Sequence, residues 1–184
     1  MKTVTKQVTL KGIRPLMFDR YAGDNNTELL PEQKMYFGTE KNDLVMPSAN
    51  IHSFLCAENT KSAVKLAYDT RQYKKYAQAV LGFVSIEPFM IPITRNGDQI
   101  YFNGFDENGI TVHKSVARLA KGVPNKKERP LVDLPWELEF KVTIYPNDLI
   151  SDVSVRLLFE KGGIPIGLGT YRGVYGKFVV DSWE

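Results

Sequence analysis

A strand, a helix and a second strand follow one another in the last third of the chain. Residues 136–145 (WELEFKVTIY) alternate apolar and polar side chains, which is typical of a strand with one buried face. After a break at Pro146, Ser151 can cap a helix that has apolar residues at helical spacing and ends near Gly162. The segment 177–183 (KFVVDSW) predicts a closing strand. Because such a helix must cover a sheet, we expect an α+β protein.

The preceding residues add further strands and helices. The turn-forming pair Asn96-Gly97 separates two strand-like segments, which predicts an antiparallel hairpin. A short apolar strand at 44–46 leads through Pro47-Ser48 into a helix. The other elements are an opening strand at 4–13 and, at 61–80, one broken helix or two short ones. These elements predict helices packed on one face of a mainly antiparallel sheet.

Length and composition indicate one domain spanning residues 1–184. Hydrophobic residues make up 43% and charged residues 24% of the chain, which excludes a disordered or fibrous protein. The segments 19–41 and 114–130 lack clear periodicity and are expected to be excursions or mobile loops. The net charge of only +3 excludes a polycation, so any anion site must be a local cluster. The second segment is such a cluster, with six Lys and Arg against Glu128.

The single cysteine and the N-terminal sequence bear on metals and on the compartment. Cys56 has no partner for an intrachain disulfide, and no spacing of Cys and His matches a zinc site. We therefore expect neither a metal nor a cofactor. The N-terminal residues lack the apolar block of a signal peptide, and no apolar run approaches the roughly 18 residues that cross a bilayer. These features favour a cytoplasmic protein without membrane contact, in the host cytoplasm if the protein is viral.

Six of the 14 glycines lie close together near the C-terminus: Gly162, Gly163, Gly167, Gly169, Gly173 and Gly176. This segment cannot be a regular strand or helix throughout, because glycine adds backbone freedom and offers no side chain to pack. One interpretation is a loop whose main-chain N–H groups approach a phosphate, with added charge from Arg172 and Lys177. Tyr171 and Tyr175 would offer faces for stacking. The other interpretation is a closely packed glycine hairpin in which Arg172 pairs with an acid.

Three segments share a pattern with a known family. In the glycine segment, a Gly-hydrophobic-Gly, an arginine and an aromatic-glycine pair precede the final strand. The stretch LVMPSANIHSFL (44–55) is a strand, a Pro-Ser pair and a helix, and KKERPLVDLPWELEF (126–140) is a basic stretch that runs into a strand. Together they resemble the RAMP superfamily, the RNA-binding subunits of CRISPR effector complexes.

The resemblance to RAMP proteins implies a ferredoxin-like (RRM-like) fold that binds RNA. The short chain favours a small stand-alone relative from a phage or another mobile element. One segment departs from the family: the helix at 50–55 lacks the Gly and Arg that often occur there. The resemblance therefore gives no arginine contact to RNA from this helix.

Few residues are available for catalysis. His52 and His113 are the only imidazoles and fall on different elements, so the sequence pairs neither with a second catalytic group. His52 follows a strand-to-helix junction and is the better candidate, although a lone histidine on an apolar helix is more often packed than catalytic. By the RAMP resemblance, Asp19 and Asp24 match in position an acidic residue with which some backbone subunits cut target RNA. Asp19 and His52 are therefore weak catalytic candidates.

The predicted function is non-catalytic binding of single-stranded nucleic acid, with RNA favoured over DNA and a homo-oligomer along the strand left open. Cations would neutralise phosphates and tyrosines would stack on bases, giving salt-dependent and weakly sequence-selective binding. The residues expected to bind are Gly167, Gly169, Tyr171, Arg172, Gly173, Tyr175, Gly176, Lys177, Lys126, Lys127 and Arg129. Two alternatives stay open: a structural or assembly protein of a phage or mobile element, and a small RNA-cleaving enzyme of the same fold.

Overall fold

The main sheet of the protein has seven strands and is antiparallel at every pairing. The computed structural model describes residues 2–118, 122 and 124–184. The path through the sheet is β10-β1-β9-β5-β3, with β4 also beside β9 and β6 beside β5. The strands are β1 Val4–Gly12, β3 Val45–Pro47, β4 Val84–Glu87, β5 Met90–Arg95, β6 Asp98–Gln99, β9 Glu137–Ile144 and β10 Phe178–Trp183.

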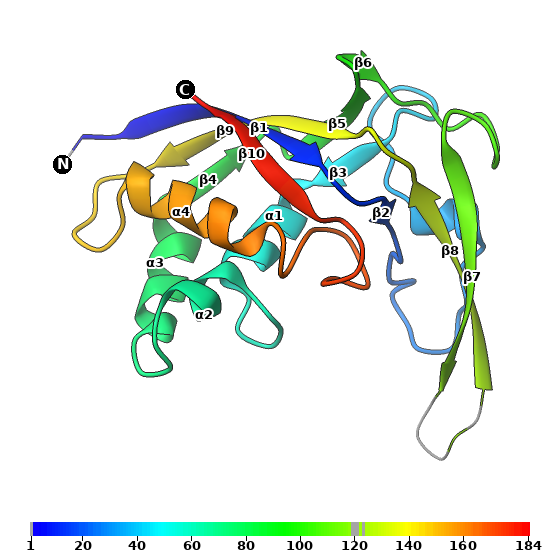
Figure 1. Cartoon of the computed structure of the whole chain (residues 1–184), viewed down its shortest axis with the longest axis horizontal. Helices are drawn as coiled ribbons and strands as arrows, with labels where there is room; N and C mark the ends of the chain where they lie inside the picture. The colour runs from blue at the N-terminus through cyan, green and yellow to red at the C-terminus, as the bar shows by residue number, and fades with distance from the viewer. Residues whose placement is uncertain (1, 119–121, 123) are drawn as a thin grey trace.

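The order of these strands is that of a ferredoxin-like fold. β1 pairs with β10 on one side, where Leu10 faces Val180, and with β9 on the other, where Val8 faces Phe140. β4 and β5 both pair with the other edge of β9. The chain runs from β1 through helices to β4 and β5, returns along β9 and reaches β10 through one more helix, so two β-α-β units interleave (Figure 1). The predicted α+β, ferredoxin-like fold is confirmed.

The α-helices of the described residues lie on one face of the sheet (Figure 1). They are α1 Ser48–Cys56, α2 Ala63–Ala67, α3 Tyr73–Phe83 and α4 Asp152–Gly162. The helical stretch expected at 61–80 therefore forms two helices. Phe54 of α1 joins helices to sheet, because its ring centroid lies 5.7 Å from Phe159 of α4 and 5.2 Å from Phe178 of β10.

The alternating sequence pattern at 136–145 forms a strand with one buried face, as predicted. The apolar residues of β9 are buried, while its intervening polar residues are exposed or half-buried. Ser151 caps α4 as predicted, since its Oγ accepts a hydrogen bond of 3.2 Å from the backbone N–H of Ser154. The buried face of β9 and the capped helix thus fix the second β-α-β unit.

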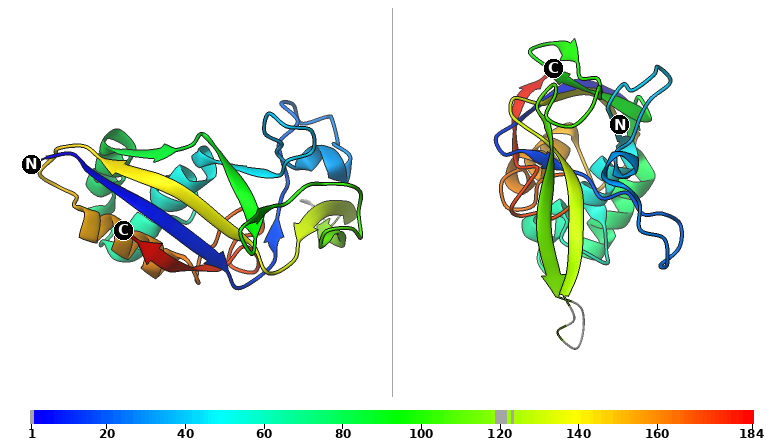
Figure 2. Two further views of the ribbon diagram at one scale, coloured as in Figure 1. Left: turned by 90° about the horizontal axis from the view of Figure 1, so that it is seen from above. Right: turned by 90° about the vertical axis from the view of Figure 1, so that its right-hand side faces the viewer.

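A second, three-stranded sheet includes the β7–β8 hairpin, an arm that projects from the body of the molecule (Figures 1 and 2). Its strands are β2 Leu16–Met17, β7 Ile110–Arg118 and β8 Pro124–Val132. Residues 114–118 and 124–130, expected as loop, are instead strand, and 119–121 and 123 lie outside the described residues. The hairpin lacks an apolar stripe here, because Lys114 faces Glu128 and His113 faces Arg129. Alternation of apolar residues therefore could not predict that these residues form strands.

The excursion, residues 19–41, connects β2 to β3 and contains one 3-10 turn, η1 Pro31–Lys34. Lys34 is buried there, and its ammonium donates a 2.8 Å hydrogen bond to the carbonyl oxygen of Glu128 in β8. The excursion is thereby attached to the arm. Within the described ranges, every helix is too short or too polar to cross a membrane.

Candidate functional site

The glycine loop, residues 163–177, connects α4 to β10 and is held against the segment that follows β1. The N–H of Thr170 donates to the carbonyl oxygen of Met17 at 2.9 Å, and that of Gly176 donates to Pro15 at 2.7 Å. A Cβ on Gly169 would collide with the same carbonyl oxygen of Met17. The loop therefore packs backbone against backbone on residues 15–17.

Two glycines of this loop, Gly167 and Gly176, allow its close internal packing. Gly167 and Gly176 are buried and have φ values of +75° and +66°, which side chains rarely adopt. The Leu168 N–H donates to Gly176 at 2.9 Å, and the Gly173 N–H donates to Ile166 at 2.7 Å. These amides are bonded within the protein, which corrects the expectation that they are free to approach a phosphate. For Gly167 and Gly176, this close packing agrees with the packed-hairpin interpretation.

The partner of Arg172 is not the acid that the packed-hairpin interpretation predicted. Its Nη2 donates a 2.9 Å hydrogen bond to Oγ1 of Thr60. Within the described part of the chain, no carboxylate forms an ion pair with this guanidinium. Arg172 is half-buried, and burial lowers the pKa of its guanidinium. A cation that is partly desolvated and lacks an acid gains from binding an anion.

A cavity of about 470 Å³, here called the Arg172 cavity, opens at this guanidinium. Its lining combines the start of α1, the α1–α2 loop and the glycine loop: Asn50, Ser53, Thr60, Lys61, Gly169, Thr170, Tyr171 and Arg172. Among the described residues, the lining contains two cations, one amide, three hydroxyl side chains besides the tyrosine, and no acid. The Pro-Ser helix element and the glycine segment, which are far apart in the sequence, thus meet at one site suited to an anion.

A row of aromatic rings connects the glycine loop to the arm. The ring centroid of Tyr175 lies 5.5 Å from that of His113 in β7, in an edge-to-face arrangement. On its other side, Tyr175 lies 5.8 Å from Tyr171, which is 56% exposed and also lines the Arg172 cavity. The row therefore begins at the cavity and offers π faces beside it. The expected pair Tyr171 and Tyr175 is brought together, whereas His113 was not expected in the site.

Of the three arm cations expected to bind, two are neutralised by ion pairs. Lys127 pairs with Glu28 at 2.8 Å, and Arg129 pairs with Asp19 at 2.7 Å. Lys34 contributes a further pair with Glu28 at 2.8 Å, and the two lysines lower the pKa of Glu28 to about 2. These pairs attach the excursion to the arm. Lys126 of β8 is exposed, and it forms no ion pair with any described residue.

Three further candidate residues, Lys177, Gly173 and Asp19, do not line the Arg172 cavity. The side chain of Lys177 is half-buried and does not line the cavity. The backbone carbonyl oxygen of Lys177 accepts a 2.8 Å hydrogen bond from the N–H of Ile13. Gly173 is half-exposed at φ +90°, and an added Cβ would meet only the carbonyl oxygen of Pro165, at 3.6 Å. Asp19 is engaged by Arg129 and lies 3.8 Å from the ammonium of Lys34.

His52 lines a different cavity, of about 720 Å³, next to the apolar side chains of Leu81 and Phe89. Its Nδ1 is buried without a hydrogen-bond partner in the described residues, and burial lowers the pKa of the imidazole. Asp19 does not line this cavity, so the two weak catalytic candidates do not share a site. Among the residues described, no group of three or more His, Cys, Asp and Glu could hold a metal.

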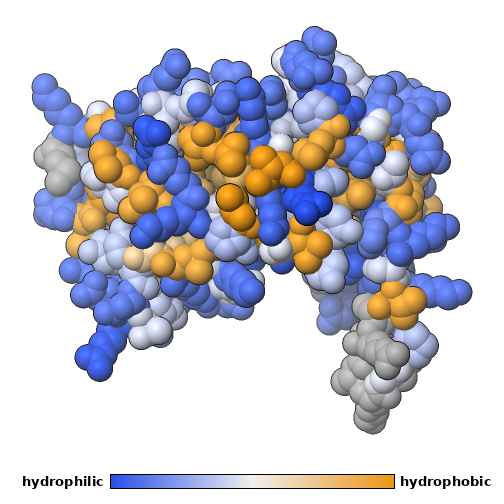
Figure 3. All heavy atoms as spheres, in the orientation of Figure 1, coloured by the Kyte–Doolittle hydropathy of each residue, from blue (hydrophilic) through white to orange (hydrophobic). Residues whose placement is uncertain are grey.

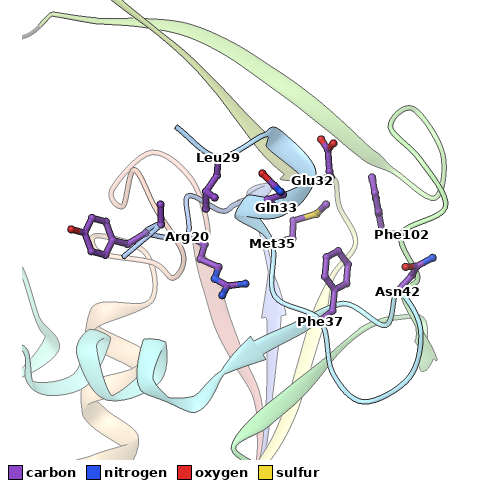
Figure 4. Close-up of a pocket in the computed structure, with 10 residues that line it drawn as sticks. Arg20, Leu29, Glu32, Gln33, Met35, Phe37, Asn42 and Phe102 are labelled. Carbon is purple, nitrogen blue, oxygen red and sulfur yellow. The ribbon is translucent and has the colours of Figure 1, made fainter. Parts of the chain in front are cut away.

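A cavity of about 520 Å³, lined mostly by residues of the excursion, was not predicted from the sequence (Figure 4). Met35, Phe37 and Phe102 form an apolar part of its lining, and Arg20 and Asn42 add polar groups. The guanidinium of Arg20 lies 5.9 Å from the ring centre of Tyr36, a cation–π contact between two residues of the excursion.

By its fold, the protein belongs to the α+β class with a ferredoxin-like sheet, to which an arm is added. Its candidate site is the Arg172 cavity beside the packed glycine loop. No protein-family model matches the sequence, and no curated protein matches it. Among solved structures, the fold is similar to a chain in the cryo-EM structure of the type III-B Cmr-beta bound to cognate target RNA. The TM-score is 0.56 at 12% identity, covering 100% of this chain and 60% of that chain. The likeness agrees with the ferredoxin-like fold expected from the sequence.

Proposed function

We propose that the protein binds single-stranded nucleic acid, and RNA in preference to DNA, at the Arg172 cavity and the aromatic row beside it. The observation that carries the proposal is the half-buried guanidinium of Arg172, which has a hydroxyl partner and no acid in the described residues. A phosphate in the cavity would supply the missing negative charge.

The proposed division of labour follows from the kinds of side chain present. Arg172 and Lys61 bind a backbone phosphate, and the amide of Asn50 and the hydroxyl of Ser53 add hydrogen bonds from α1. Bases adjoining that phosphate stack on Tyr171 and the rings behind it. Since a phosphate and a π face are common to every nucleotide, this arrangement gives weak sequence selectivity.

The preference for a single strand and for RNA has separate support. Stacking on Tyr171 needs a base that is not enclosed in a duplex. The Cmr-beta structure, to which the fold is similar, is bound to target RNA. The arrangement of several copies along one strand, the assembly role and an origin in a phage or mobile element stay predictions.

The test is a fluorescence-anisotropy titration with labelled RNA of about eight nucleotides, a length within the range that small single-strand binding folds cover. We expect Arg172→Gln to weaken binding on the order of tenfold and to make the salt dependence shallower by about 0.7, because one phosphate contact is lost. Lys6→Gln is the matched control: it removes the same charge from β1, outside the cavity lining. Equal effects of the two variants, or no binding by wild type at about 50 mM salt, would contradict the proposal.

A further inference from the structure

A basic surface that the sequence did not single out lies on α2, α3 and the loops before them. Between residues 61 and 75 the chain carries five cations and one acid, Asp69, whereas the net charge of the whole chain is +3. This α2–α3 basic surface consists of Lys61, Lys65, Arg71, Lys74 and Lys75. In Figure 3, hydrophilic side chains gather at the lower left, where Figure 1 places α2 and α3.

The cations of the α2–α3 basic surface are not used in ion pairs. None of the five pairs with an acid within the described residues, in contrast to Lys127 and Arg129 of the arm. The nearby acid, Asp69, instead accepts a 2.6 Å hydrogen bond from the backbone N–H of Arg71. The surface therefore retains its positive charge.

We propose that the α2–α3 basic surface binds the phosphodiester backbone of a nucleic-acid strand that continues out of the Arg172 cavity. This inference rests on the proposed function and assigns it a second set of contacts. Lys61 belongs to both regions, because it lines the cavity and begins the surface. The surface thus extends the phosphate-binding site from one cavity to a path.

A chain of contacts leads from the cavity to α3. Thr60 receives a hydrogen bond from Arg172 at its hydroxyl and another, of 2.7 Å, from the Lys65 ammonium at its carbonyl oxygen. The ammonium of Lys65 also lies 5.5 Å from the ring centre of Tyr73, the first residue of α3. Two cations therefore share one residue of the α1–α2 loop, and the second reaches the helix that carries Lys74 and Lys75.

The two helices hold these cations on a fixed support. The rings of Tyr68 and Tyr76 stack in parallel, with centroids 3.6 Å apart and an interplanar angle of 4°. This stack joins the end of α2 to α3 and leaves Arg71, Lys74 and Lys75 exposed. Because the support is formed in advance, fewer degrees of freedom are lost when a strand binds.

The position of the lysines is unfavourable for the helix itself. Lys74 and Lys75 lie in the first turn of α3, which has no acid. Cations at this end oppose the helix dipole, which favours negative charge there. Their placement adds nothing to helix stability, and a bound polyanion would be stabilised by both the lysines and the helix end.

The test compares two labelled single-stranded RNAs, of about six and about twenty nucleotides, so that only the longer one extends well beyond the cavity. The test variant is Arg71→Gln/Lys74→Gln/Lys75→Gln, and the control, with the same loss of charge, is Lys2→Gln/Lys6→Gln/Lys41→Gln. For the longer RNA we expect the test variant to bind on the order of tenfold more weakly, with a salt slope shallower by about two, because three phosphate contacts are lost. The shorter RNA should bind both variants like wild type.

Separate outcomes decide the inference and the proposed function. Equal affinity of the test and control variants for the longer RNA would overturn the inference while wild-type binding stands. Loss of binding in this test variant but not in Arg172→Gln would instead contradict the proposed cavity. Binding of poly-glutamate through the same three cations, as tightly as RNA, would assign the surface to an acidic protein and overturn the inference. The melting temperature of the test variant should not fall, since unfavourable charges are removed.

Discussion

Gly176 illustrates how single residues of the glycine loop depend on distant backbone. Its φ of +66° and the collision of an added Cβ with the carbonyl oxygen of Leu168 both require glycine. The sequence located this glycine cluster and the charged and aromatic residues within it. It could not show that the amide of Gly176 is bonded to Pro15, because that contact joins segments far apart in the chain.

We predict that Gly176→Ala lowers the free energy of unfolding more than Gly173→Ala does. Both glycines have positive φ, so each variant pays roughly 1–2 kcal/mol for a left-handed backbone. Gly176→Ala must also displace the backbone at Leu168, whereas a Cβ at Gly173 has its nearest neighbour 3.6 Å away, at Pro165. Urea unfolding of the two variants measures the difference. Equal destabilisation would show that the loop does not depend on this close packing.

Some secondary-structure elements could be predicted from the sequence, whereas the arm could not. The strand at 136–145 could be predicted because it has one buried face, and the α4 helix because of its cap and spacing. The β7–β8 hairpin could not, since charged pairs such as Lys114 and Glu128 occupy positions where an apolar stripe would mark a strand. Glu28 of the excursion, which pairs with Lys127 of this hairpin, lies 99 positions away in the sequence.

We predict that the contact between the excursion and the arm weakens in acid through Glu28. Lys127 and Lys34 lower the pKa of this carboxyl from 4.5 to about 2 in the folded protein. A depressed pKa means that the ionised form stabilises the folded state above pH 4.5 and that this stabilisation is lost as the pH falls toward 2. Glu28→Gln should therefore be less stable than wild type at pH 7, and the difference should shrink below pH 4.5.

Urea unfolding at several pH values measures this difference, with Glu40→Gln as the control. Glu40 lies on the same excursion and forms no ion pair in the described residues. A stability difference for Glu28→Gln that is constant from neutral pH to acid would contradict the ion-pair role.

Across the whole molecule, the distribution of charge separates cations that hold the fold from cations that are free to bind. The sequence located a basic stretch on the arm, but Lys127 and Arg129 are paired there with acids of the excursion. Five cations without an ion pair in the described residues lie on α2, α3 and the loops before them, in a stretch that was expected only to form helices. Counting charges along the chain cannot distinguish these groups, because pairing depends on which distant segments the fold brings together.

Two double variants with the same loss of charge make this separation measurable. Lys127→Gln/Arg129→Gln leaves Glu28 and Asp19 without these partners, so we expect it to lower the free energy of unfolding by about 1–3 kcal/mol, the range for a polar group that loses its partner. The salt dependence of RNA binding should change little. For Lys61→Gln/Arg172→Gln we expect stability within about 1 kcal/mol of wild type, since one hydrogen bond to Thr60 is lost. Its salt slope should become shallower by about 1.4, as expected for two lost phosphate contacts.

The comparison combines urea unfolding with anisotropy titrations over a range of salt concentrations on the same protein preparations. Because both variants lose two positive charges, a general effect of net charge would lower the salt slope equally in each. Equal slopes would thus show that the protein attracts nucleic acid through its overall field. A selective change in Lys61→Gln/Arg172→Gln would instead locate the phosphate contacts at the Arg172 cavity, where the α1–α2 loop meets the glycine loop.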